Sequence, residues 1–168
     1  RSSKCNIKSA WTMNIREDST PRIKIIQKIY SKTINPDLKI EYNKSQYKKF
    51  IKDVTEGTLE REEFIKDLIE KSLKNDIDLK RTDKLLKIII YAAVFELLFK
   101  HNNSKSVIIS EYIKTSQFFL EKAQIKYLNA ILDKLSHLIR KDWVSVNLYR
   151  QYINFSLRFG KYFGIYHL

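Results

Sequence analysis

Apolar residues recur along most of the chain at steps of three and four, which places them on one face of a helix. Thr20 and Pro21 come just before the first such run and are typical of a helix N-cap and a first helical position. Asn35-Pro36-Asp37 then ends that helix. The whole pattern predicts six helices, over about residues 21–34, 47–57, 58–73, 81–100, 106–120 and 121–139.

The stretch from Arg81 to Lys100 differs from the others because it is apolar on nearly every face. A helix of this kind packs on several sides, so we expect it at the centre of the domain. Ser104, in the loop that follows, is the candidate N-cap of the next helix. Strand-like alternation is confined to residues 144–148. The predicted fold class is therefore all-α, a compact bundle of about six to seven helices.

The length of 168 residues fits one domain, which we expect over residues 21–140. Residues 1–20 show no sustained period and are interpreted as an irregular leader. The chain starts with an arginine, and its only methionine is Met13. Met13 is therefore a candidate native start, with residues 1–12 preceding it.

Residues 141–168 form a basic C-terminal extension that holds eight of the chain's 21 aromatic residues. From Tyr149 onward the aromatic residues step by three or four, and most of the basic residues fall on another face. This pattern is typical of a helix that docks on a membrane surface or a partner. Two further interpretations stay open: an extra helix packed on the domain, and translation past the native end.

The chain carries a net charge of +13, from 32 basic and 19 acidic residues. Such an excess favours binding to a polyanion, because each phosphate that is neutralised releases counterions. The 24 lysines and 23 isoleucines, against 8 arginines, are also typical of an AT-rich genome, which would make lysine the default surface residue. Residues 21–140 keep +8 of the excess. Charge alone therefore indicates a polyanion without identifying it.

No catalytic motif stands out in the sequence. The three glycines cannot form a phosphate-cradling loop, and no nucleophile elbow occurs. Glu96 is the one carboxylate deep in an apolar helix, and we interpret it as a buried charge held by a helix N-terminus or a lysine. We expect no enzyme activity, no catalytic residue and no cofactor.

Metal binding and membrane insertion are not indicated either. The single cysteine, Cys5, excludes an internal disulfide and fits a reducing compartment. His101, His137 and His167 lie far apart, without the spacing of metal ligands. No apolar run reaches the roughly 18 residues of a membrane span, and no secretory signal is visible. The expected location is the cytoplasm.

Three stretches, taken in order, resemble the NusB family of bacterial transcription antitermination factors. Residues 21–30 (PRIKIIQKIY) are similar to the family's opening helix, in which an Arg is followed by a Gln and a terminal Leu-Tyr. Residues 81–98 are similar to its apolar helix ending in Tyr-Glu-Leu, here Phe95-Glu96-Leu97. VIISEY at 107–112 and KYLNAILDK at 126–134 resemble Val-x-Ile-Asn-Glu-Ala and Lys-Phe-Val-Asn-Gly-Val-Leu-Asp. The order and spacing agree over about residues 20–140.

The resemblance implies an all-helical RNA-binding protein that acts in transcription regulation. It implies binding to the boxA element of nascent ribosomal RNA, together with the small-subunit ribosomal protein NusE, in an antitermination complex on RNA polymerase. The RNA-binding residues it implies are Arg16, Arg22, Lys24, Gln27, Lys28, Lys126, Tyr127 and Asn129.

These residue types suit RNA, although some have structural alternatives. Arg22 can make bidentate contacts with phosphate or base, and Tyr127 offers a ring on which an unpaired base can stack. Core packing is the other interpretation of Tyr127, and a helix-to-helix hydrogen bond that of Asn129. Glu96 and Glu111 are expected to hold helices together rather than to touch RNA.

The sequence departs from the family pattern at several positions. Asp18-Ser19-Thr20 stands where arginines are expected, Ser110 replaces an Asn, and Asn129-Ala130 replaces Asn-Gly. These changes bear on RNA preference more than on fold. Two other functions remain open: the NusB-like module of a ribosomal RNA cytosine methyltransferase, which would need a following catalytic domain so that only a truncated fragment could qualify, and a helical bundle that binds proteins without specific RNA binding.

Overall fold

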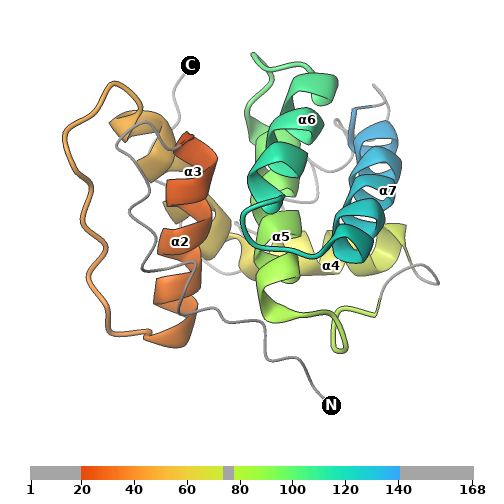
Figure 1. Ribbon diagram of the computed structural model, residues 1–168, viewed down its shortest axis with the longest axis horizontal. Coiled ribbons are helices and arrows are strands. Elements are labelled where there is room, and N and C mark those ends of the chain that lie inside the picture. Colours follow the sequence, from red (N-terminus) through yellow and green to blue (C-terminus); the bar gives the residue numbers. More distant parts are fainter. Residues whose placement is uncertain (1–19, 74–77, 141–168) are drawn as a thin grey trace, which may run out of the picture.

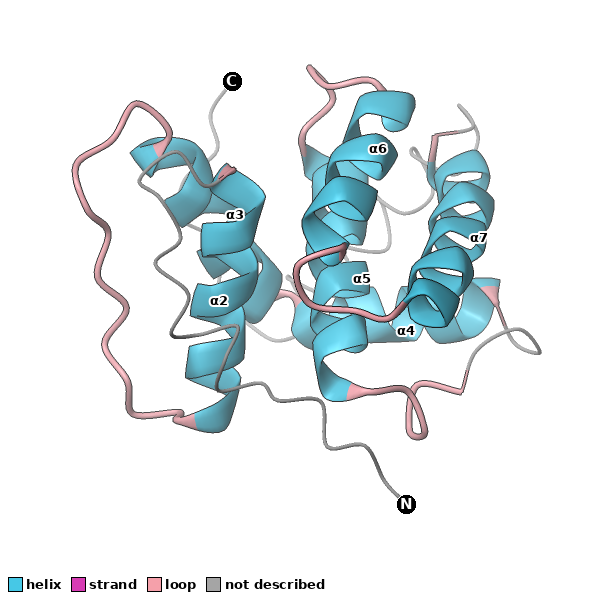
Figure 2. Cartoon of the chain, in the orientation of Figure 1, coloured by secondary structure: helices cyan, strands magenta, loops and turns pink. Residues whose placement is uncertain are grey.

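The chain folds into a bundle of helices, and no strand occurs within the part that is described (Figure 2). A computed structural model describes residues 20–73 and 78–140. The predicted leader with Arg16, and the C-terminal extension after residue 140, lie outside the described residues. The helices are α2 (Pro21–Ile34), α3 (Lys48–Glu60), α4 (Glu62–Ser72), α5 (Lys84–Phe99), α6 (Lys105–Ser116) and α7 (Lys122–Ile139).

Helix α5 is the centre of the bundle, as its all-round apolar pattern predicts. Every residue from Ile88 to Leu97 is buried, and the helix packs against α2, α3, α4, α6 and α7. In Figure 1, α2 and α3 lie on one side of α5 and α6, α7 lies on the other, and α4 crosses behind. The two helices that carry the RNA-binding residues expected from the sequence, α2 and α7, are thus held on opposite sides of a common core.

Most predicted helix starts are confirmed, and the caps explain why. Pro21 is the first residue of α2, preceded by Thr20 at the N-cap position. Ser104 caps α6 by accepting a hydrogen bond from the Val107 amide. Helix α5 begins at Lys84 because the Asp83 carboxylate accepts from the amides of Leu85 and Leu86. Side-chain capping therefore sets the starts of α5 and α6, whereas α2 begins at Pro21 without a capping hydrogen bond from the Thr20 side chain.

The predicted helix end near Gly57 is wrong, since α3 continues through Gly57 to Glu60. A β-carbon at position 57 would lie 2.2 Å from Cζ of Phe95 on α5. The glycine therefore permits close approach of two helices and does not end one. The helix predicted over 106–120 also ends earlier, at Ser116.

Candidate nucleic-acid interface

Arg22 lies inside the protein, although the family resemblance places it in the RNA contact. Its side chain is 9% exposed, and its guanidinium donates to both carboxylate oxygens of Glu96, at 3.2 Å from Nε and 2.8 Å from Nη2. Nη1 lies 3.7 Å from Glu111. The guanidinium also lies 5.5 Å from the ring centres of Phe50 and Tyr112. Arg22 thus holds α2 against α5 and α6.

The expectation that a helix N-terminus or a lysine holds Glu96 is wrong. The carboxylate, which is fully buried, is held by Arg22 and by the Tyr112 hydroxyl, which donates at 2.7 Å. Burial by itself lowers the pKa of Arg22, but the carboxylates of Glu96 and Glu111 outweigh it and raise that pKa. The arginine therefore stays charged, and the expectation that Glu96 and Glu111 hold helices together is confirmed by these contacts.

Three other residues expected from the sequence, Lys24, Gln27 and Lys28, lie half-buried on the side of α2 away from α5. The connection of residues 35–47 runs back alongside α2 to the start of α3 (Figure 1), and all three residues line the groove between α2 and this connection. Lys28 Nζ donates to the Glu41 carbonyl at 2.5 Å and lies 5.1 Å from the Tyr42 ring centre. Lys32 fastens the start of the connection through the carbonyls of Pro36 and Leu38. Lysines of α2 thus hold the connection in place.

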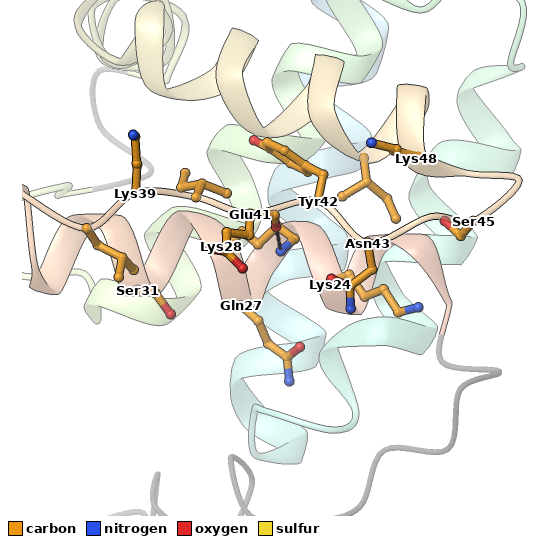
Figure 3. Close-up of a pocket in the computed structure, with 13 residues that line it drawn as sticks. Lys24, Gln27, Lys28, Ser31, Lys39, Glu41, Tyr42, Asn43, Ser45 and Lys48 are labelled. Carbon is orange, nitrogen blue, oxygen red and sulfur yellow. Dashed lines mark hydrogen bonds between the residues drawn. The ribbon is translucent and has the colours of Figure 1, made fainter.

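A groove of about 600 Å³ lies between α2 and this connection (Figure 3). Four lysines line it: Lys24, Lys28, Lys39 and Lys48. Glu41 is the one carboxylate in its lining, whose other polar members are Gln27, Ser31, Tyr42, Asn43 and Ser45. Burial, with the positive charge of Lys24 nearby, lowers the pKa of Lys28. The groove is therefore a concentration of positive charge that an anion would relieve.

Sequence reasoning missed the part of this groove that comes from the connection. Lys39 and Asn43 lie in a polar stretch without periodicity, and Lys48 is the first residue of α3, so nothing in their spacing indicates that they line a groove with α2. The sequence does show a local excess of lysine between residues 39 and 52. This excess indicates a positively charged surface but does not predict a groove.

On α7, the three expected residues lie on the outer surface. Lys126, Tyr127 and Asn129 are exposed, Tyr127 to 36%. The opposite face of the helix is buried through Leu128, Ile131, Leu132 and Leu135. An exposed ring at Tyr127 fits the stacking interpretation better than core packing. The side chain of Asn129 is also at the surface, where RNA could reach it.

The end of α6 lies between the two sets of residues. Thr20 and Thr115 bring their hydroxyl oxygens within 3.5 Å, which joins the start of α2 to the end of α6. From there residues 117–121 lead directly into α7. Phe118 in this connection is 62% exposed, and sequence reasoning missed it because the periodic pattern extended the helix over it. The connection thus carries an exposed aromatic side chain just before α7.

Neither metal ligation nor a membrane span is found in the described part of the chain. Among residues 20–73 and 78–140, no group of three or more His, Cys, Asp or Glu side chains could hold a metal ion. None of the helices α2 to α7 is long and apolar enough to cross a membrane.

The fold defines an all-α protein in which one apolar helix is enclosed by five others. The family profile described as the NusB family matches residues 9–137, and the chain belongs to this family. The structure is similar to that of T. maritima NusB, with a TM-score of 0.60 and 22% identity over 70% of this chain and 89% of that one. At that identity the likeness concerns the fold.

The curated relatives are named transcription antitermination protein NusB. The protein from Mesorhizobium japonicum is 34% identical over 86 residues, which are 51% of this chain and 56% of that protein. The protein from Nitrobacter hamburgensis is 30% identical over 91 residues, covering 54% of this chain and 57% of its own length. The chain thus spans a little over half the length of the curated relatives it matches.

Proposed function

We propose that this protein is a transcription antitermination factor of the cytoplasm. It binds boxA-type RNA of nascent ribosomal RNA transcripts together with the ribosomal protein NusE and joins an antitermination complex on RNA polymerase. The observation that carries the proposal is a NusB-family chain with exposed basic and aromatic side chains on α7 and lysines along α2. The function proposed is binding, without catalysis or a cofactor.

The RNA contacts are proposed for two sets of residues, Lys24, Gln27 and Lys28 on α2, and Lys126, Tyr127 and Asn129 on α7. The lysines would neutralise phosphates, and the amides of Gln27 and Asn129 can donate to and accept from base edges. Tyr127 offers a stacking surface, and Phe118 adds a second exposed ring in the connection just before α7. Arg16 remains a proposed contact in the segment before α2.

Arg22 takes a different role in this proposal. Its guanidinium is committed to two carboxylates, so a direct RNA contact would have to break a buried ion pair, which costs several kcal/mol. Arg22 therefore positions α2, and with it Lys24 and Gln27. Substitution of Arg22 should weaken RNA binding only as far as it lowers the free energy of unfolding.

The test is a titration of RNA with the chain and its cognate NusE-type ribosomal protein at physiological salt. We expect tighter binding to boxA-type RNA than to a scrambled RNA of equal length. Equal affinity for the two RNAs would contradict the proposal and leave a nonspecific polyanion binder.

Variants of α7 test the site itself. Tyr127→Ala should weaken binding about tenfold through lost stacking, and Tyr127→Phe should retain most of the affinity. Lys126→Ala should weaken binding and reduce its salt dependence, whereas Lys71→Ala on α4 serves as a control with the same loss of charge. If Lys126→Ala and Lys71→Ala bind alike, α7 is not the RNA-binding helix.

A further inference from the structure

The groove between α2 and the connection of residues 35–47 is larger than the proposed contacts of α2 require. Only Lys24, Gln27 and Lys28 of its lining belong to those contacts. Lys39, Asn43 and Lys48, which come from the connection and the start of α3, widen it. In Figure 3 the Asn43 amide lies beside the Lys24 side chain, and Gln27 extends away from the connection at the rim. The groove is thus built from two separate parts of the chain.

The charge of the lining selects an anion. Lys24, Lys28, Lys39 and Lys48 face one carboxylate, that of Glu41. The Lys28 ammonium donates a hydrogen bond to the Glu41 carbonyl at 2.5 Å, and the Glu41 carboxylate offsets only part of the effect of burial and of Lys24 on the Lys28 pKa. The fall in the pKa of Lys28 has burial and Lys24 as its causes, and a bound phosphate would remove the second cause.

The volume and the remaining polar groups select among anions. About 600 Å³ falls in the range of sites that hold a molecule of nucleotide size. Lysines act as point charges on phosphate oxygens, and the side chains of Asn43, Ser31 and Ser45 supply donors and acceptors for the sugar hydroxyls. A protein segment rich in carboxylates could use the same charges and the same neutral groups, so a competition experiment must distinguish it from RNA.

We infer that this groove binds the sugar-phosphate backbone of single-stranded RNA next to the segment contacted by α7, with Lys39 and Lys48 as additional phosphate ligands. This inference rests on the proposed RNA-binding function and extends it. The bound strand would run from α7 past the end of α6 and the rim residue Gln27 into the groove. The groove contributes affinity without reading sequence.

The test compares a short boxA-type RNA with the same RNA extended by a few uridines at either end, using the full chain with its NusE-type partner. The unsubstituted protein should bind the RNA extended at one of its two ends about tenfold more tightly than the short RNA, because the extension adds two phosphate contacts. These contacts should also steepen the plot of log affinity against log salt concentration by about 1.4. The double variant Lys39→Gln/Lys48→Gln should lose this gain and bind the short RNA unchanged.

The control is Lys71→Gln/Lys80→Gln, which removes the same charge from exposed positions outside the groove. It should retain the gain. If both double variants lose the gain equally, net charge explains it and the groove assignment is wrong. If the Lys39/Lys48 variant keeps the gain, the groove does not bind the extension. Failure of the proposed function is a separate outcome, because it appears with the short RNA as equal binding of boxA and scrambled sequences.

Two further measurements locate the strand. An extension carrying 5-iodouridine should cross-link to Tyr42 in the groove lining on illumination, and cross-links confined to residues outside the groove lining would overturn the inference. A polyglutamate peptide should displace the extension poorly compared with oligouridine. Equal displacement by the two competitors would identify a general anion site and overturn the assignment to RNA.

Discussion

At the residue scale, Glu96 is the point at which three helices meet through one carboxylate. It accepts from Arg22 of α2 and Tyr112 of α6 while it belongs to α5 itself. A buried charge is stable only when it is paired and hydrogen-bonded. Both partners lie on other helices, so this side chain adds an ion pair and a hydrogen bond to the apolar packing of α2 and α6 on α5.

Replacement of Glu96 by glutamine should lower the free energy of unfolding by about 3 kcal/mol, because it leaves the buried Arg22 charge without its main partner. Urea denaturation monitored by circular dichroism would measure the change. Asp67→Asn is the matched control, since its ion pair with Lys71 is exposed and should contribute within about 0.5 kcal/mol. Equal effects of the two substitutions would refute the role given to Glu96.

At the scale of elements, the contact of α3 with α5 depends on the absence of a side chain at Gly57. Alanine there would be favoured by helix propensity by about 1 kcal/mol, but its β-carbon would overlap the Phe95 ring. Overpacking of this kind outweighs propensity in a closely packed core.

Gly57→Ala should therefore reduce the free energy of unfolding by roughly 2 kcal/mol, despite the better helix former. Phe95→Leu in the same chain should relieve part of the overlap, so the double variant should be at least about 1 kcal/mol more stable than the two single effects predict. A thermodynamic cycle of the four proteins gives this coupling. Additive effects would mean that Phe95 does not set the cost.

The same elements show what the sequence can and cannot predict. Helix α2 and helix α7 were predicted nearly to their ends, because Thr20-Pro21 and the spacing of apolar residues are local signals. The role of Gly57 depends on Phe95, 38 positions away in the sequence. A glycine is a common helix-ending residue, so the sequence around Gly57 predicted a helix end that the structure does not have. The role of Arg22 is equally non-local, because Glu96 and Glu111, which pair with it, come from α5 and α6. The groove combines α2 with the connection of residues 35–47, whose sequence has no periodicity, so the sequence does not predict that the two lie side by side.

At the scale of the whole molecule, buried tyrosines set the response to alkaline pH. Burial raises the pKa of Tyr42 to about 12, and it raises the pKa of Tyr91 and, further, of Tyr112 above the ordinary value. In the unfolded chain these hydroxyls ionise near pH 10. Stability is therefore unaffected by them below about pH 10 and is lost as the pH rises from there toward the folded-state values.

We expect the free energy of unfolding to fall steeply above about pH 10, by up to about 1.4 kcal/mol per pH unit for each tyrosine. Tyr112→Phe should make this decline shallower, although it lowers stability at neutral pH by about 1 kcal/mol through the lost hydrogen bond to Glu96. Urea titrations at several pH values would measure both effects. An unchanged alkaline slope in Tyr112→Phe would contradict the assignment.

The ion pair between Arg22 and Glu96 joins residues 74 positions apart, which has a consequence for synthesis of the chain. A ribosome adding roughly 5–20 residues per second would produce Glu96 about 4–15 seconds after Arg22. During that interval α2 has no buried carboxylate to receive its arginine, and α5 has yet to supply the surface on which α2 and α3 pack. The apolar residues of α2 and α3 that pack on α5 are therefore uncovered until α5 has been synthesised. We expect the nascent chain to bind a chaperone most readily during this interval.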